Sequence, residues 1–247
     1  MRMQLEPFVM SDEQLLDELY SRFSPKSNRK MRLRFFRKKL FYSLVISSTK
    51  AVKRLLDILL SLLAITLASP LFLLLALCVY YDDSCPIIYI SKRVGKHGRL
   101  FNLYKFRSMY RNAERQKKQL LSKNRHTEGV TFKMKEDPRI TPIGKFLRRS
   151  SLDELPQLFN VLKGDMSLVG PRPPLIEEVK KYGIEERKRL HITPGLTGLW
   201  QVSGRASVDF SKQVKLDLAY IESQSLWGDL IILLKTIPAV LCGRGAY

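Results

Sequence analysis

The sequence lacks the residues and spacings from which disulfide frameworks and zinc sites are built. It has three cysteines and three histidines among 247 residues. They are Cys78, Cys85, Cys242, His97, His126 and His191, and none forms a C-x-x-C pair or another metal-ligand spacing. We therefore expect neither a zinc site nor a disulfide framework. Thiols that stay reduced suit a folded domain facing the cytoplasm.

Acidic residues are also scarce. The chain carries 43 Lys and Arg against 23 Asp and Glu, a formal net charge of +20. Such a balance indicates an anionic partner: nucleic acid, an anionic membrane surface or phosphate-bearing substrates. Charge alone does not choose among these, and a solvated basic face is the plain structural alternative.

The scarcity of acids is most pronounced near the N-terminus, since no Asp or Glu occurs between Arg22 and Arg54. Aromatic and basic residues alternate there, a pattern typical of segments that bind anionic lipid headgroups. A nucleic-acid-binding arm is the competing interpretation. We treat residues 1–49 as a basic N-terminal extension.

An apolar run follows, from Ile58 to Val79, interrupted by Ser69-Pro70. About 20 apolar residues suffice to span a bilayer. Pro70 predicts a kink, and the carbonyl that it frees needs a partner, which the Ser69 hydroxyl can supply. Both flanks are basic, so the positive-inside rule places both in the cytoplasm. We expect residues 50–81 to form a re-entrant membrane helix broken at Ser69-Pro70; a kinked spanning helix and a buried core helix are the alternatives.

Residues 82–247 read as a catalytic domain of the α+β class, rich in helix. Residues 86–90 and 100–106 predict two strands of a hairpin around a basic turn at 94–99. We expect an exposed helix over residues 111–124 and a loop or small strand over 124–137. The apolar tail from Leu226 to Leu241 is interrupted by charges and Pro238, which indicates an interfacial or packing helix. The whole predicts a membrane-associated, monotopic enzyme.

Asp153 and Glu154 are the strongest candidates for chemistry. The structural alternative is a capping box, in which Ser151 is the N-cap, Glu154 the third helical position and Pro156 lies near the first turn. A helix N-terminus also receives phosphate readily. Neighbouring helical positions point in different directions, so the two acids would have different functions.

One of these acids could attack phosphorus while the other holds a divalent metal. Magnesium is the natural metal, because one or two carboxylates plus substrate phosphates hold it; we count both Asp153 and Glu154 at this site. Basic side chains that match phosphate lie in the loops expected to converge: Lys105, Arg107, Arg148 and Arg172. For each of these side chains, the alternative is a position on the solvated surface with no role in phosphate binding. Asp165, after a glycine, is either a metal or substrate ligand or a turn residue.

Several ordered motifs carry a resemblance to a known family. They are Lys105-Phe106-Arg107-Ser108-Met109, Asp137-Pro138-Arg139-Ile140-Thr141, Ser151-Leu152-Asp153-Glu154-Leu155-Pro156-Gln157, the segment from Lys163 to Pro173, and the segment from Pro194 to Arg205. From about Lys53 to Tyr247 the chain resembles the bacterial sugar transferases, the monotopic phosphoglycosyl transferases. Residues 1–52 lie outside the resemblance.

The resemblance implies an enzyme that moves a sugar-1-phosphate from a UDP-sugar to undecaprenyl phosphate and releases UMP. Asp153 would be the nucleophile that forms a covalent phosphosugar intermediate, and Glu154 would support Mg²⁺. Lys105, Arg148 and Arg172 would contact phosphate. Ser69-Pro70 falls on the break of the family's re-entrant helix.

The same resemblance places the protein on the bacterial inner membrane, with the catalytic domain on its cytoplasmic face. Its partners would be a UDP-hexose such as UDP-galactose or UDP-glucose, undecaprenyl phosphate and inner-membrane lipids; no nucleic acid is expected and a homodimer stays open. The pathway would be exopolysaccharide, capsule or O-antigen synthesis. The alternative is a non-enzymatic basic module that binds membranes or nucleic acid, which predicts salt-sensitive binding and no UMP release.

Overall fold

The structure is a computed structural model that describes residue 18 and residues 29–113, 137–204 and 208–241. Its contacts divide the chain into two units, Gln4–Leu56 and Asp57–Tyr247. The expected domain limits after residues 49 and 81 stay predictions. Most of the N-terminal extension, and most of the helix and loop expected over residues 111–137, lie outside the described residues.

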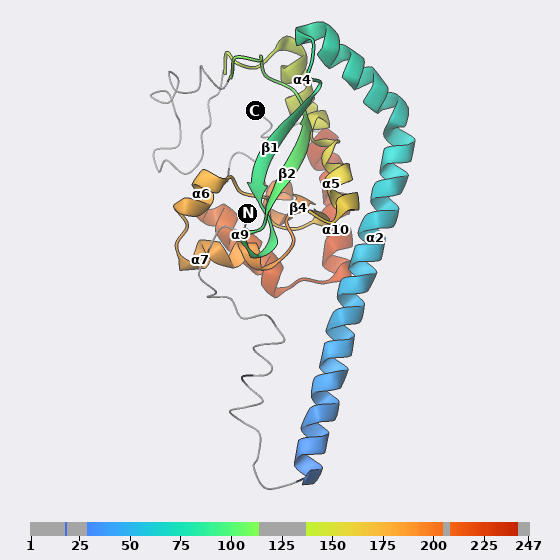
Figure 1. The fold of residues 1–247 in the computed structure, drawn as a ribbon, viewed down its shortest axis with the longest axis vertical. Coiled ribbons are helices and arrows are strands. Elements are labelled where there is room, and N and C mark those ends of the chain that lie inside the picture. The colour runs from blue at the N-terminus through green and yellow to red at the C-terminus, as the bar shows by residue number, and fades with distance from the viewer. Residues whose placement is uncertain (1–17, 19–28, 114–136, 205–207, 242–247) are drawn as a thin grey trace. The chain divides into compact units, whose positions relative to one another are not determined.

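Helices dominate, and two small two-stranded sheets lie among them (Figure 1). The elements are α2 (Arg29–Asp83), β1 (Ile88–Val94), the 3₁₀ helix η1 (Lys96–Gly98), β2 (Leu100–Phe106), α4 (Pro142–Ser150), η3 (Leu152–Glu154), α5 (Gln157–Lys163), β3 (Ser167–Val169), α6 (Ile176–Lys180), α7 (Ile184–Arg187), η4 (Lys188–His191), β4 (Gly195–Thr197), α8 (Leu199–Val202), α9 (Phe210–Glu222) and α10 (Leu226–Leu241). The expected helix-rich α+β class is confirmed.

Helix α2 contains the apolar run. Its stretch Ser47–Asp83 is long and apolar enough to cross a membrane, judged by length and composition. Only 11% of its most apolar window is buried, which does not fit the buried core helix considered as an alternative. Figure 1 shows α2 bending sharply in its teal, C-terminal part.

Pro70 lies inside this helix and cannot donate a hydrogen bond to the carbonyl oxygen four residues earlier, that of Thr66. The Ser69 hydroxyl donates to that same oxygen at 2.9 Å. The partner predicted for the freed carbonyl is therefore present, and the helix continues through the proline without leaving this group unsatisfied.

Strands β1 and β2 form the predicted antiparallel hairpin, with Arg93 opposite Phe101 and Tyr89 opposite Lys105. Strand β1 runs to Val94, four residues beyond the expected end at Ile90. Because side chains alternate between faces along a strand, Arg93 shares its face of the hairpin with Leu103 and Lys105. The longer strand thus places one more cation on the face that carries Lys105.

The main core joins the hairpin to helices from several parts of the chain. Buried side chains come from β2, α5, the segment around β3, α9 and α10: Phe101, Leu103, Leu158, Val161, Met166, Leu168, Val169, Tyr220 and Ile232. Ala64 and Ile65 of α2 pack against them. Helix α10 buries Ile232 yet exposes an apolar stripe of Trp227, Leu230, Ile231, Leu234 and Ile237. It is a packing helix on one side, and its other side has the pattern expected of an interfacial helix.

All three residues of strand β3 are buried, and the strand pairs in parallel with β4. The backbone N–H of Leu168 donates to Asp57 Oδ1 of α2 at 3.0 Å. The hydroxyl of Tyr220 in α9 donates to Asp229 Oδ1 of α10 at 2.7 Å and lies 3.1 Å from the carbonyl oxygen of Val169. Helices α2 and α9 therefore hydrogen-bond to the strand that leads into the Gly170-Pro171-Arg172-Pro173 loop, and α10 holds the Tyr220 hydroxyl in place.

Candidate active site

Asp153 and Glu154 lie on η3, a single 3₁₀ turn between α4 and α5. The capping box considered as the structural alternative is not formed. Ser151 has a left-handed backbone, with φ 58° and ψ 16°, closes α4 as its C-cap, and makes no side-chain cap hydrogen bond. A residue in this conformation turns the chain between two helical segments and is not placed to cap the second. The two acids are thus presented on a tight turn.

The two carboxylates have different surroundings. The Asp153 side chain is 10% exposed and that of Glu154 is 34% exposed. Burial raises the pKa of Asp153, and the negative charge of Glu154 adds to this effect against the opposing charges of Lys105 and Arg148. For Glu154, burial also raises the pKa, but the charge and hydrogen bond of Lys105 outweigh it, so its pKa is lowered. The pair is therefore electrostatically asymmetric.

Lys105 on β2 joins the two acids. Its Nζ donates to Glu154 Oε1 at 2.5 Å and lies 3.8 Å from Asp153 Oδ2. Arg148, in the last turn of α4, donates from Nε to Ser108 Oγ at 2.8 Å and attracts Asp153 electrostatically. Lys105 therefore lines the pocket, whereas Arg148, held by Ser108, lies outside the pocket lining.

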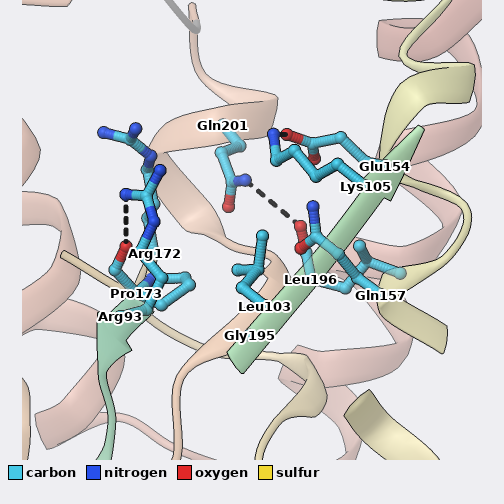
Figure 2. Close-up of a pocket in the computed structure, with 10 residues that line it drawn as sticks. All are labelled: Arg93, Leu103, Lys105, Glu154, Gln157, Arg172, Pro173, Gly195, Leu196 and Gln201. Carbon is cyan, nitrogen blue, oxygen red and sulfur yellow. Dashed lines mark hydrogen bonds and ion pairs between the residues drawn. The ribbon is translucent and has the colours of Figure 1, made fainter. Parts of the chain in front are cut away.

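A pocket opens beside η3 (Figure 2). Its lining comes from the hairpin, η3, α5, the loop after β3, β4 and α8: Arg93, Leu103, Lys105, Glu154, Gln157, Arg172, Pro173, Gly195, Leu196 and Gln201. Figure 2 shows Arg93 and Arg172 on one side, Lys105 with Glu154 on the other, and Gln201 between them. Asp153 is next to the lining, in contact with it through Lys105.

The loop that carries Arg172 is locked to β4. The N–H of Gly195 donates to the carbonyl oxygen of Pro171 at 2.8 Å, and the N–H of Gly170 donates to that of Thr197 at 2.9 Å. A Cβ on Gly195 would lie 2.0 Å from the backbone nitrogen of Gly170, so the close approach requires glycine. This contact fixes the start of the loop, and Arg172 Nη1 lies 4.0 Å from Glu178 Oε1.

Arg107 and Asp165 also lie outside the pocket lining, and unlike Asp153 and Arg148 they take no part in the interactions that the structure describes around the two acids. Arg107 is buried and donates from Nη2 to the carbonyl oxygens of Asp83 and Ser84, at 2.6 and 2.7 Å, where α2 ends. Asp165 follows the turn at Gly164, and its Oδ2 accepts a hydrogen bond of 3.4 Å from Asn160 Nδ2. The geometry gives Arg107 an anchoring contact and Asp165 a turn position, and their phosphate or metal roles stay predictions without structural support.

The pocket also contains residues that the sequence analysis did not select, chiefly Arg93 and Gln201. Gln201 donates from Nε2 to the carbonyl oxygen of Leu196 at 3.2 Å, while its buried Oε1 has no hydrogen-bond partner among the described residues. That acceptor is available to a donor on a ligand. A predicted strand that ran on to Val94 would have placed Arg93 on the same face as Lys105, because side chains alternate between the two faces of a strand. No local sequence pattern indicates that Gln201 lines the pocket.

A buried ion pair supports the segment that leads to β4. Arg189 of η4 donates to Asp217 Oδ2 of α9, from Nε at 2.8 Å and from Nη2 at 2.6 Å, and from Nη1 to the Tyr182 hydroxyl at 2.9 Å. Both charged side chains are at most 4% exposed. Burial raises the pKa of Asp217 to about 6 although Arg189 opposes the rise.

The site, two carboxylates bridged by a lysine and faced by two arginines, is that of a protein that handles anionic groups. A family model described as bacterial sugar transferase matches residues 48–243. The chain belongs to the bacterial sugar transferase family.

Three relatives illustrate the similarity. Galactosyl transferase CpsE of Streptococcus agalactiae serotype III (strain NEM316) is 54% identical over 165 residues, which are 66% of this chain and 36% of that protein. Undecaprenyl-phosphate galactose phosphotransferase of Salmonella typhimurium is 49% identical over 203 residues, 81% of this chain and 42% of that protein. Exopolysaccharide production protein ExoY of Sinorhizobium fredii is 43% identical over 198 residues, 79% of this chain and 88% of that protein. The chain thus spans less than half of the first two relatives.

The Arg189–Asp217 pair generates a stability prediction. Arg189→Met leaves Asp217 buried without its cation and is expected to cost about 3–5 kcal/mol. Without Arg189, the pKa of Asp217 in the folded state rises further above its value in the unfolded state. The loss of stability is therefore small at acidic pH, where Asp217 is protonated, and grows as pH rises. Melting followed by circular dichroism at pH 5 and pH 8 measures this difference. Arg189→Met combined with Asp217→Leu should recover most of the loss. An equal loss at both pH values would contradict the assignment.

Proposed function

We propose that this chain is a phosphoglycosyl transferase. It moves a hexose-1-phosphate from a UDP-hexose, such as UDP-galactose or UDP-glucose, to undecaprenyl phosphate and releases UMP, as the first membrane step of exopolysaccharide, capsule or O-antigen synthesis. The relatives support the substrate classes through their names, undecaprenyl-phosphate galactose phosphotransferase and UDP-galactose-lipid carrier transferase.

The observation that carries the proposal is the position of Lys105 between Asp153 and Glu154, at a pocket that also holds Arg93 and Arg172. A lysine next to a buried carboxylate favours the ionised form that a nucleophile requires, and the charge of Lys105 opposes the rise in the pKa of Asp153 that burial causes. Cations around the pocket offset the charge of an incoming diphosphate. A non-enzymatic basic module would have no use for two acids held in this way.

The reaction follows from this arrangement in two steps. A carboxylate oxygen of Asp153 attacks the β-phosphorus of the UDP-sugar, and the bond from that phosphorus to the bridging oxygen breaks, so UMP leaves with the electron pair. An oxygen of undecaprenyl phosphate then attacks the same phosphorus, and the bond to Asp153 breaks. The lipid diphosphate sugar departs and the Asp153 carboxylate is restored, with no net proton transfer.

Magnesium fits the residues present. Among the described residues no group of three or more His, Cys, Asp or Glu could hold a metal ion. A Mg²⁺ site does not need one, because one or two carboxylates with substrate phosphates and waters suffice. Glu154, which lines the pocket with a lowered pKa, and Asp153 beside it would hold the ion. Bound Mg²⁺ would screen the diphosphate charge and stabilise the leaving phosphate.

The proposal includes a place in the cell: the bacterial inner membrane, with the catalytic domain on its cytoplasmic face. The apolar stretch of α2 enters and leaves by one face, since its two flanks are both basic. The bend and the Ser69–Thr66 hydrogen bond support a broken helix in hydrocarbon. The apolar stripe of α10 would lie at the same surface.

The nucleophile assignment is tested by Asp153→Asn. Incubation with UDP-galactose or UDP-glucose labelled in the β-phosphate is expected to label the wild-type protein covalently and the variant not at all. UMP release should fall by roughly 10³-fold or more, since the covalent route is lost. Labelled protein is measured by gel autoradiography and intact mass, and omission of Mg²⁺ with EDTA present should prevent labelling of the wild type.

Glu185→Gln is the matched control, because Glu185 is an exposed carboxylate paired with Lys188 on the surface. It should label like the wild type. Wild-type rates of UMP release in Asp153→Asn would reject the proposed nucleophile.

The pH dependence of adduct formation tests the electrostatics. Burial raises the pKa of Asp153 above the ordinary value of 3.8, so the single-turnover rate should rise with pH through a midpoint above 3.8. Lys105→Gln removes a charge that lowers this pKa and should move the midpoint to higher pH. A midpoint that stays unchanged or moves to lower pH in Lys105→Gln would contradict this assignment.

The topology is tested by cysteine labelling. In a background with Cys78, Cys85 and Cys242 replaced by serine, Lys50→Cys and Lys92→Cys report the two ends of the apolar stretch. A re-entrant helix predicts that a membrane-impermeant maleimide labels both positions only after spheroplasts are lysed. Pro70→Leu removes the cause of the bend and should expose one of the ends in intact spheroplasts. Labelling of one end before lysis in the parent protein would establish a spanning helix instead.

A further inference from the structure

Arg93 lines the pocket and has hydrogen-bonding capacity that the protein leaves unused. Its Nη1 donates to the carbonyl oxygen of Pro173 at 3.2 Å, which orients the guanidinium. Its Nε is buried and has no hydrogen-bond partner among the described residues. A buried donor without a partner is costly, and a ligand acceptor at this point would remove that cost.

The charge around Arg93 also favours a bound anion. Among the lining side chains, Arg93, Lys105 and Arg172 are cationic and Glu154 is anionic. Burial and the neighbouring charge of Arg172 lower the pKa of Arg93 to about 10, so Arg93 stays charged at neutral pH and is repelled by Arg172. The Glu178 carboxylate partly offsets this repulsion, because its Oε1 lies 4.0 Å from Arg172 Nη1 and its charge opposes the fall in the pKa of Arg93, but its Oε2 already accepts from the N–H of Leu175 at 2.8 Å. A phosphate between the two arginines would offset this repulsion.

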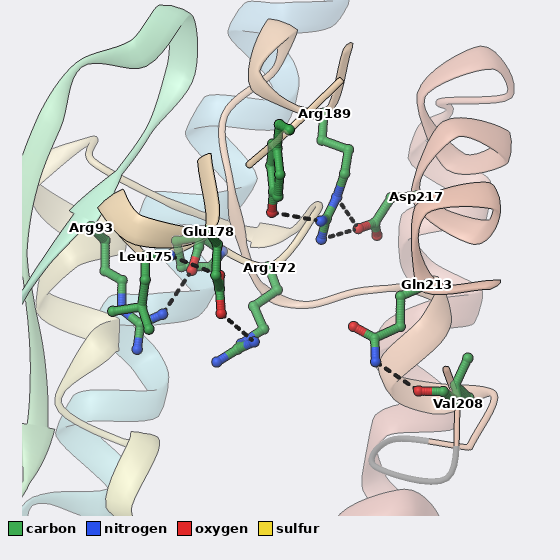
Figure 3. Close-up of polar contacts among 10 residues, drawn as sticks. Arg93, Arg172, Leu175, Glu178, Arg189, Val208, Gln213 and Asp217 are labelled. Carbon is green, nitrogen blue, oxygen red and sulfur yellow. Dashed lines mark hydrogen bonds and ion pairs between the residues drawn. The ribbon is translucent and has the colours of Figure 1, made fainter. Parts of the chain in front are cut away.

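The position of the pair across the pocket is informative. Figure 2 shows Arg93 and Arg172 opposite Lys105 and Glu154, the side on which Asp153 lies. Figure 3 shows the two arginine side chains extending toward the same space, with Glu178 next to Arg172. In a phosphoryl transfer the attacking and leaving oxygens lie roughly in line, on opposite sides of phosphorus. A group that leaves when Asp153 attacks must therefore depart toward the side away from Asp153.

We propose that Arg93 and Arg172 form one phosphate subsite that both half-reactions use. It holds the phosphate of UMP as it leaves and later the phosphate of the polyprenyl acceptor as it attacks. This inference rests on the proposed function. Attack on the Asp153-bound phosphorus must come from the side opposite Asp153, which is the side that UMP vacated, so the two monophosphates occupy the same place in turn.

The binding test compares UMP with uridine by isothermal titration calorimetry on the full chain in detergent. Arg93→Gln should weaken UMP binding roughly 10- to 100-fold, the equivalent of one charge-assisted contact, and leave uridine binding unchanged. Arg93→Lys keeps a charge but loses the planar fork, and an intermediate loss is expected. Lys92→Gln, the exposed neighbour on the same strand, is the matched control and should bind UMP like the wild type.

The kinetic test addresses the sharing of the subsite. UMP should compete with undecaprenyl phosphate for the preformed adduct, and Arg93→Gln should raise the KM for undecaprenyl phosphate and the inhibition constant of UMP by similar factors. Either of two results overturns the proposal. If Arg93→Gln weakens the binding of uridine and of UMP equally, Arg93 has only a structural role. If Arg93→Gln weakens UMP binding but leaves the KM for undecaprenyl phosphate unchanged, the two phosphates bind at separate subsites.

The outcome is separable from that of the proposed function. If the wild type forms no adduct and releases no UMP, the proposed function fails, whatever UMP binding shows. If the wild type forms the adduct and Arg93→Gln, with a melting temperature near that of the wild type, binds UMP normally, the subsite alone fails. If the melting temperature of Arg93→Gln is well below that of the wild type, UMP binding by Arg93→Lys is compared with that by the wild type instead.

Discussion

The interaction on which this site depends is the contact of one ammonium group with two adjacent carboxylates. Lys105 approaches Glu154 closely and Asp153 more distantly. Adjacent acids in a partly buried place would otherwise suppress each other's ionisation. Lys105 resolves the conflict unequally: Glu154 stays firmly charged, and the buried Asp153 has a raised pKa. The inequality gives each acid a different chemical character while both stay on one short turn.

The rest of the fold holds this turn opposite its cationic partners. The hairpin contributes Arg93 and Lys105 from a single face, so two cations at opposite sides of the pocket share one rigid element. The loop with Arg172 is fixed by backbone hydrogen bonds to β4, and β4 follows the segment anchored by the buried Arg189–Asp217 pair. Rigid elements of this kind supply the preorganisation that charge stabilisation requires.

Much of this could be predicted from local sequence, because the causes are local. A proline in an apolar run predicts a bend, and the serine before it sits where its hydroxyl reaches the freed carbonyl. Alternating apolar residues around a basic turn predict a hairpin. Adjacent acids among phosphate-binding residue types predict the dyad, and the family resemblance that these motifs carried is confirmed by the family match.

What failed depended on tertiary structure. Arg93 was overlooked because the predicted strand ended at Ile90, and pairing with β2 extends it to Val94. Ser151 has the residue type of an N-cap but adopts a left-handed backbone, which only the path between two helices dictates. Arg107 has the residue type of a phosphate ligand; in the structure it donates to the carbonyl oxygens of Asp83 and Ser84, and its phosphate role stays a prediction. Residue type indicates which interactions a side chain can make, and its neighbours in the folded structure determine which of them it makes.

The hydrogen bond from the N–H of Leu168 to Asp57 ties the start of the apolar run of α2 to strand β3. A carboxylate at the edge of a hydrophobic run is badly placed in lipid, and here it is buried against β3 instead. This hydrogen bond therefore helps to set the rotation and the depth of the helix relative to the strand that leads into the arginine loop. An unrelated anchor of equal length and hydropathy could tether the domain to a bilayer, but it would leave that strand without its acceptor. In a chimaera this helix cannot be exchanged as a modular part; it belongs to the scaffold of the site.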